Sequence, residues 1–193
     1  MSSRTPGDSI SSVTWNGVGM TSRVSAQHVG SELTAAIFDL NSPATGNHNV
    51  VVTMSGANSL YLAATVESLK GVATSSHVED TDTATGSTGA DPSFAALTTA
   101  TDGCAVIDCL ATNDTGAVTM SAETNRVERS NFLAEAQGRA VGASTIITKS
   151  PAGSVTMQWS VVDESALAGL AVKPLAEAAG IPFFTRLDSK RIS

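Results

Sequence analysis

The stretch from Ser154 to Pro174 constrains the fold more strongly than any other part of the chain. Apolar and polar residues alternate from Val155 to Val161, which is the pattern of a strand with one buried face. A polar turn at 163–165 follows, and a second alternating run extends from Ala166 to Val172. Two such runs predict a β-hairpin that closes the fold, and Pro174 ends it because proline cannot donate to a strand ladder.

Turn signals and β-branched runs predict further strands along the chain. Asn16-Gly17 lies between Val13 and Met20 and predicts a hairpin, because both turn residues tolerate positive φ. The near-continuous apolar run from Cys104 to Ala111 is typical of a strand in the middle of a sheet. Other strands are predicted at 23–26, 32–40, 50–53, 60–66, 94–97, 117–120 and 139–149.

Two segments are open to more than one interpretation. Residues 71–91 are polar and low in complexity, so they form either a long loop or a sparse strand between loops. Residues 122–138 contain a run that favours a helical turn, but Asn125, Ser130 and Asn131 favour a loop.

Length and composition indicate one all-β domain with a tail. A chain of 193 residues is long enough to bury a core, and 41 % of it is hydrophobic but only 4 % aromatic. The regular spacing of short strands predicts an antiparallel two-sheet β-sandwich. We expect an N-terminal leader at 1–10, the sandwich domain at 11–174 and an extended C-terminal arm at 175–193.

The net charge of −7 argues against a nucleic-acid surface, because such surfaces are basic. No apolar run approaches the roughly 20 residues of a membrane span, and Met1 to Ile10 lack the apolar core of a signal peptide. We expect a protein that is made in a cytoplasm and stays there until assembly or lysis. Cys104 and Cys109 are predicted to be buried thiols, because they lie about 16 Å apart on opposite faces of one predicted strand.

Candidate metal sites are weak. The three histidines, His28, His48 and His77, lie apart in polar segments without the spacing of metal ligands. The segment from Asp80 to Asp91 begins like a calcium loop, but the acceptor series and the closing glutamate are missing. A solvated acidic loop is the simpler interpretation, and calcium binding stays open. We expect no metal and no cofactor.

Candidate catalytic groups are equally weak. Asp39, Asp108 and Asp163 could be taken as a carboxylate set, but no spacing pairs any two of them, and roles in turns or at sheet edges are favoured. No nucleophile motif or phosphate loop is present. The sequence therefore predicts a protein that is not an enzyme.

The C-terminal arm carries the candidate partner-docking residues. It combines an apolar cluster with a locally cationic end, and apolar groups outside the strand pattern have to be buried against the body or a neighbour. The predicted docking residues are Ile181, Pro182, Phe183, Phe184, Arg186, Leu187, Lys190 and Arg191.

Six short motifs, in this order and spacing, resemble a jelly-roll-like β-sandwich module of tailed-bacteriophage virion proteins. They are V-T-W-N-G at 13–17, G-N-H-N-V-V-V-T at 46–53, D-P-S-F at 91–94, G-C-A-V-I-D at 103–108, V-T-M-Q-W-S at 155–160 and A-L-A-G-L-A-V-K-P at 166–174. The sequence departs from that module in two ways. Only about ten polar residues precede the first motif, which leaves a sheet edge uncovered, and an apolar, cationic arm follows the last.

The resemblance implies a structural role in a virion. We expect a head decoration or minor capsid protein that binds the assembled shell through its termini. Its partners would be the major capsid protein or other virion proteins, and it would form a homo-oligomer without nucleic acid or membrane. The alternative is a carbohydrate-binding module on a tail or adsorption device, for which Trp15, Trp159 and Tyr61 are the available Trp and Tyr platforms.

Overall fold

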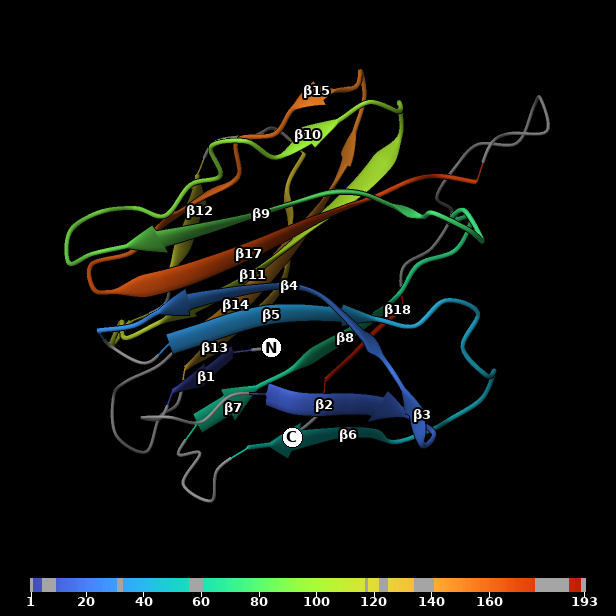
Figure 1. The fold of residues 1–193 in the computed structure, drawn as a ribbon. Coiled ribbons are helices and arrows are strands. Elements are labelled where there is room, and N and C mark those ends of the chain that lie inside the picture. Colours follow the sequence, from blue (N-terminus) through green and yellow to red (C-terminus); the bar gives the residue numbers. More distant parts are fainter. Residues whose placement is uncertain are drawn as a thin grey trace.

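The computed structural model describes residues 2–4, 10–30, 33–55, 61–116, 118–121, 125–133, 141–175 and 188–191. These residues form antiparallel strands and turns (Figure 1), and none of them is helical. The predicted all-β, antiparallel, sandwich-type fold is confirmed. Within the described part of the chain there is accordingly no helix that could cross a membrane.

The central layer is a five-stranded sheet in the order β13–β14–β11–β17–β9. All eight residues of β17 are buried, as are eight of the nine in β11, because other parts of the chain cover both faces of this sheet. The apolar run at 104–111 thus lies in the middle of a sheet, as predicted. The strands are β9 (Val78–Gly86), β11 (Cys104–Thr112), β13 (Val127–Leu133), β14 (Val141–Lys149) and β17 (Ser165–Val172).

A second sheet covers one face of the central layer. Its order is β4–β5–β1–β7, and its side chains Val24, Leu33 and Ala35 pack on Cys109 and Leu170. Figure 1 shows β4 and β5 lying in front of the central sheet. These strands are β1 (Ser2–Arg4), β4 (Thr21–His28), β5 (Leu33–Asp39) and β7 (Tyr61–Ala63).

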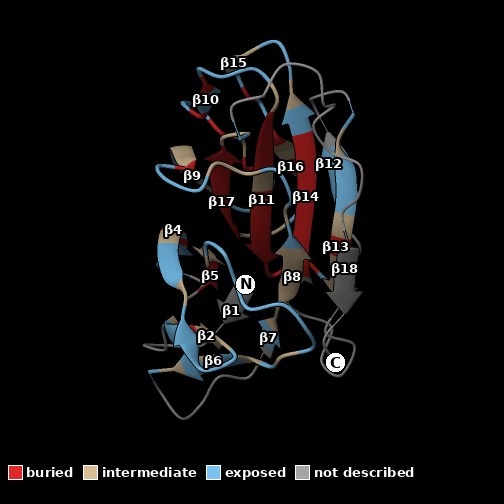
Figure 2. Ribbon diagram, turned by 90° about the vertical axis from the view of Figure 1, so that its right-hand side faces the viewer, coloured by how far each residue is buried: buried red, intermediate tan, exposed pale blue. Residues whose placement is uncertain are grey.

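Short strands and loops cover the other face. Phe94, Leu97, Met157 and Trp159 pack there on Leu110 and its neighbours. Figure 2 shows the central strands β11, β14 and β17 as mostly buried. The short strands pair as β10 (Thr98–Thr99) with β15 (Gly153–Ser154) and β12 (Thr119–Ser121) with β16 (Gln158–Ser160).

The predicted closing hairpin is wrong. The alternating burial from Val155 to Val161 is confirmed, but only 158–160 of that run form a strand, and the second run is buried on both faces rather than on one. β16 pairs with β12, whereas β17 pairs with β11 and β9. The two runs therefore lie in different layers, and Trp159 packs on the face of the central sheet. Alternation reports which side chains are buried, but it does not report which strand is the neighbour.

A third sheet, in the order β3–β2–β6, lies at the end of the molecule remote from β10 and β15 (Figure 1). Its strands are β2 (Ile10–Trp15), β3 (Val18–Gly19) and β6 (Val50–Met54). The hairpin predicted at Asn16-Gly17 is confirmed, since β2 pairs with β3 and both turn residues have positive φ, 51° and 76°. The remaining strands, β8 (Thr65–Ser68) and β18 (Asp188–Arg191), pair with each other.

Several segments differ from their predictions. Residues 2–4, expected in a leader, form β1 between β5 and β7, because backbone pairing does not require apolar side chains. For 71–91 the structure confirms the second alternative, a strand between loops, which is the edge strand β9, whereas 122–138, predicted as a helical turn or a loop, contains β13. Residues 94–97 are not a strand, although Phe94 and Leu97 are buried.

Gly169 in β17 has no room for a larger side chain. Its replacement should therefore disturb the packing between the central sheet and the layer that contains Phe94. A Cβ at this position would lie 2.4 Å from Cζ of Phe94, whose ring is itself buried. We expect Gly169→Ala to lower the free energy of unfolding by about 1–3 kcal/mol, as overpacking does, measured by urea denaturation.

Gly116→Ala is the matched control, because a Cβ there meets nothing within 4 Å. The variant Phe94→Leu should recover part of the loss in the Gly169→Ala background. Equal costs for the two glycine variants would contradict the packing argument.

Candidate functional site

Asp108 forms the centre of a buried polar cluster. Its Oδ2 accepts hydrogen bonds from Arg126 Nη2 at 2.5 Å and from Trp159 Nε1 at 2.8 Å. Its Oδ1 accepts the backbone N–H of Thr145 at 2.5 Å and the Thr145 hydroxyl at 2.8 Å. The Arg126 guanidinium lies over the Trp159 ring, with Cζ 4.9 Å from the centroid. The cluster joins β11, β14 and β16.

This cluster is sealed from solvent. The side chain of Asp108 has no exposed surface, and that of Arg126 is 3 % exposed. Burial raises the pKa of Asp108, while the Arg126 charge and the hydrogen bonds from Thr145 and Trp159 act to lower it. A carboxylate without access to solvent cannot reach a substrate, so the cluster serves the core. The expected turn or edge role of Asp108 is wrong, because the residue lies in the central strand.

The acidic residues of β9 bind the loop at 95–101. Carboxylate oxygens of Glu79, Asp80 and Asp82 accept its backbone N–H groups in sequence along the strand. The pairs are Asp82 with Ala95 and Ala96, Asp80 with Thr98, and Glu79 with Ala100 and Thr101, at 2.8–3.3 Å.

These contacts bear on the calcium hypothesis for Asp80 to Asp91. Calcium takes six to eight oxygen ligands, but the Asp80 and Asp82 carboxylates accept backbone hydrogen bonds from the loop and Asp91 accepts one from Val161 at 3.0 Å. Among the described residues, no group of three or more His, Cys, Asp or Glu side chains could hold a metal ion. The acidic segment therefore organises a loop by hydrogen bonds.

Both cysteines are buried thiols outside any disulfide, as predicted. The thiol of Cys104 donates a hydrogen bond to Glu79 Oε2 at 2.8 Å. Burial raises the pKa of Cys104 to about 12, and the hydrogen bond to Glu79 and its charge add to the shift. The thiol therefore stays protonated at neutral pH and is a poor nucleophile.

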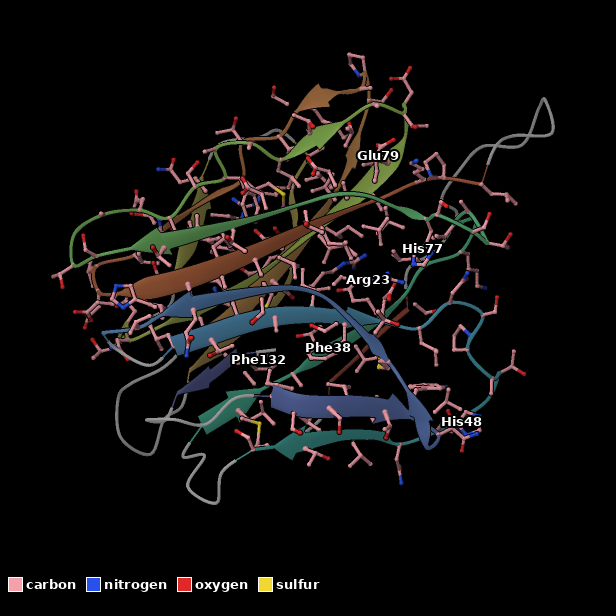
Figure 3. All side chains as sticks on the ribbon, in the orientation of Figure 1. Arg23, Phe38, His48, His77, Glu79 and Phe132 are labelled. Atoms are coloured by element: carbon pink, nitrogen blue, oxygen red, sulfur yellow. The ribbon has the colours of Figure 1, made fainter. Side chains whose placement is uncertain are left out.

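The histidines and the remaining aspartate candidates lie in separate places. Asp39 Oδ1 accepts a hydrogen bond from Arg23 Nε at 2.6 Å, and Asp39 Oδ2 contacts the Nε2 of the buried His77. Figure 3 shows Arg23 and His77 together, with His48 well apart from them. Asp163 lies in the turn between β16 and β17, as its predicted turn role requires. The three aspartates therefore do not form one site.

The predicted docking arm is described only at its end. Lys190 and Arg191 lie in β18, where they are in register with Val66 and Thr65 of β8. The other six predicted docking residues, Ile181, Pro182, Phe183, Phe184, Arg186 and Leu187, lie outside the described residues. The terminal strand is thus joined to the body of its own chain by backbone pairing.

An ion pair connects the strand that receives β18 to the central sheet. Glu67 of β8 lies 3.4 Å from Arg129 of β13, measured between Oε2 and Nε, and both side chains are largely buried. Burial raises the pKa of Glu67, and the charge of Arg129 acts to lower it. This pair was not predicted, because 62 positions separate the partners and no motif relates them.

Of the two tryptophans, only Trp15 has a side chain with surface that could meet a glycan. Trp159 is fully buried, and the side chain of Tyr61 is outside the described part. Trp15 is partly exposed, and the His48 ring packs against it in a T-shaped contact with centroids 5.7 Å apart.

Comparison of the chain with protein-family models, with curated proteins and with solved structures found no match.

Proposed function

We propose that this protein is a structural component of a tailed-phage virion, a head decoration or minor capsid protein that binds the assembled shell through its terminal segments. The pairing of the terminal strand β18 with β8 is the observation that carries the proposal. β18 has β8 on one side, and no described strand pairs with its other side, which can add to a strand edge of a partner through main-chain hydrogen bonds. We propose a tailed-phage particle because the six sequence motifs resemble a module of tailed-bacteriophage virion proteins.

The distribution of charge supports attachment through the C-terminal arm, because the arm has a cationic end and the chain as a whole is acidic. The chain has a net charge of −7, whereas 186–191 contains Arg186, Lys190 and Arg191 against Asp188. Cationic side chains beside a paired strand favour an acidic partner surface and select its orientation. The major capsid protein or another virion protein is the proposed partner.

The polar groups of the body support a role in binding rather than catalysis. Asp108 and Arg126 are sealed in the core, and Glu79, Asp80 and Asp82 hold a loop. Each of these groups has a structural partner within the chain. We therefore propose that the protein acts by holding other proteins in place.

Deletion of residues 182–193 tests the proposal. Electron microscopy and co-sedimentation of phage particles from cells that produce the tagged chain should show the intact chain on the particle and the truncated chain lost from it. The reason is that truncation removes both β18 and the cationic end.

A chain carrying Val162→Ser is the control, because Val162 is 68 % exposed on the body and lies outside the arm. Circular dichroism should show that the truncated body keeps its strand content. Equal particle association of the intact and truncated chains would contradict the proposal.

A further inference from the structure

Three edge strands carry a β-bulge whose extra residue is charged. Pairing shifts register around Arg23 in β4, Glu79 in β9 and Arg129 in β13, and each of these strands ends its sheet. Bulges and charges on an edge strand oppose pairing with another chain. The side chains also bind internal partners: Asp39, the loop at 95–101 and Glu67. These three edges are closed to strand addition.

The edge strand β6 has none of these features. Its five residues are V-V-V-T-M, without charge and without proline. The register shift in the pair of β2 and β6 falls at Ser11 of β2, so β6 itself carries no extra residue. β2 lies on one side of β6, and no described strand pairs with the other side. An uncharged edge strand without an extra residue is a ready template for another strand.

The sheet that contains β6 is also free of charged residues. Residues 10–20 and 40–55 contain β2, β3, β6 and the loop before β6, and they have no Asp, Glu, Lys or Arg, although 15 % of the chain is charged. We call this region the neutral sheet. Val18 and Val51 on it are 54 % and 53 % exposed. Protein interfaces are depleted of charge at their centres, as this region is.

We propose that β6 pairs edge to edge with β6 of a second copy of this chain. Two copies that each carry a net charge of −7 repel one another, and the neutral sheet is a surface where they can meet without like charges in contact. A strand of uncharged, mostly β-branched residues is complementary to itself in an antiparallel pair. This inference does not depend on the proposed virion role.

The pairing has a defined geometry. A two-fold axis at Val52 places Val51 opposite Thr53 of the second copy and Val50 opposite Met54, so every cross-strand pair is uncharged. The exposed Val51 and Thr53 share one face of β6, and the partly buried Val50, Val52 and Met54 share the other. The two neutral sheets then form one continuous sheet of six strands.

Light scattering after size-exclusion chromatography tests the pairing across a range of protein concentrations. The intact chain should form a dimer, and Val51→Lys should weaken it at least tenfold, equivalent to about 1.4 kcal/mol, because it places two ammonium groups near the axis. Val18→Lys is the matched control, since Val18 is equally exposed on the same sheet but lies on β3. It should leave the dimer unchanged.

Cross-linking provides a second measurement that does not require a charged variant to fold. Val52→Cys should yield a covalent dimer on a non-reducing gel after mild oxidation with diamide, whereas Val18→Cys should not. The native thiols do not compete, because both are buried. An intact chain that stays monomeric at every concentration would overturn the proposal, as would a dimer that Val51→Lys and Val18→Lys weaken equally.

Discussion

Replacing Asp108 by Asn is expected to lower the free energy of unfolding by about 3–5 kcal/mol, which is the usual cost of removing one partner from a buried ion pair. The substitution keeps the shape of the side chain and removes its charge. Arg126, whose side chain is 3 % exposed, is then left as a buried cation without its carboxylate. Urea denaturation followed by circular dichroism measures the loss.

Asp102→Asn is the control for this substitution. This variant makes the same chemical change at an exposed position. The Asp102 carboxylate accepts one backbone hydrogen bond there, from Ala152 at 2.5 Å. We expect it to cost about 1 kcal/mol or less. Similar losses for the two variants would show that the Asp108 charge contributes nothing special to the core.

A double variant separates the ion pair from the space it fills. Asp108→Leu combined with Arg126→Met removes both charges and keeps most of the volume, so it should be more stable than Asp108→Asn. The expected recovery is incomplete, because Thr145 and Trp159 each lose their acceptor. A double variant less stable than the single one would contradict the role given to the buried charge of Arg126.

Trp159→Ala is expected to cost about 3–5 kcal/mol, as large-to-small substitutions of fully buried aromatic residues do. Trp159 is 0 % exposed, fills the core between β16 and the central sheet, and donates its indole N–H to Asp108. The same urea experiment measures the loss. The free energy of unfolding of Trp159→Phe should fall between those of the intact chain and of Trp159→Ala, because phenylalanine keeps an aromatic ring but lacks the N–H donor.

Trp15→Ala is the matched control, since Trp15 is partly exposed and packs against His48 at the surface. A loss at Trp159 no larger than the loss at Trp15 would contradict the assigned packing. Trp159→Ala and Asp108→Asn should also be non-additive when combined, because their side chains are in direct contact.

The buried ion pair shows how much of the core could be predicted. Asp108 is the one charged residue in the apolar run at 104–111, and a lone charge in such a run requires a buried partner. The sequence could therefore have signalled that a partner exists. It could not identify Arg126, because the two residues lie on different elements that only folding brings together.

The edge strands show the same division. The sequence shows directly that β6 is uncharged and that β4, β9 and β13 carry charges. It does not predict that these strands lie at sheet edges, nor the bulges at Arg23, Glu79 and Arg129. A polar segment such as 78–86 becomes a strand because β17 lies beside it, and its own side chains only weakly favour that state.

The sequence by itself determined that this protein is built of short antiparallel strands, that Asn16-Gly17 forms a tight turn and that the alternating apolar side chains from Val155 to Val161 are buried. Only the tertiary structure decided that the two runs between Ser154 and Pro174 lie in different layers, and that Trp159 packs on the face of the central sheet and donates its indole N–H to Asp108. The alternation of apolar and polar side chains indicates only which side chains of that segment face the core. Strand pairing uses backbone groups that are the same in every residue except proline, so the choice of neighbour is made by the packing of the whole chain.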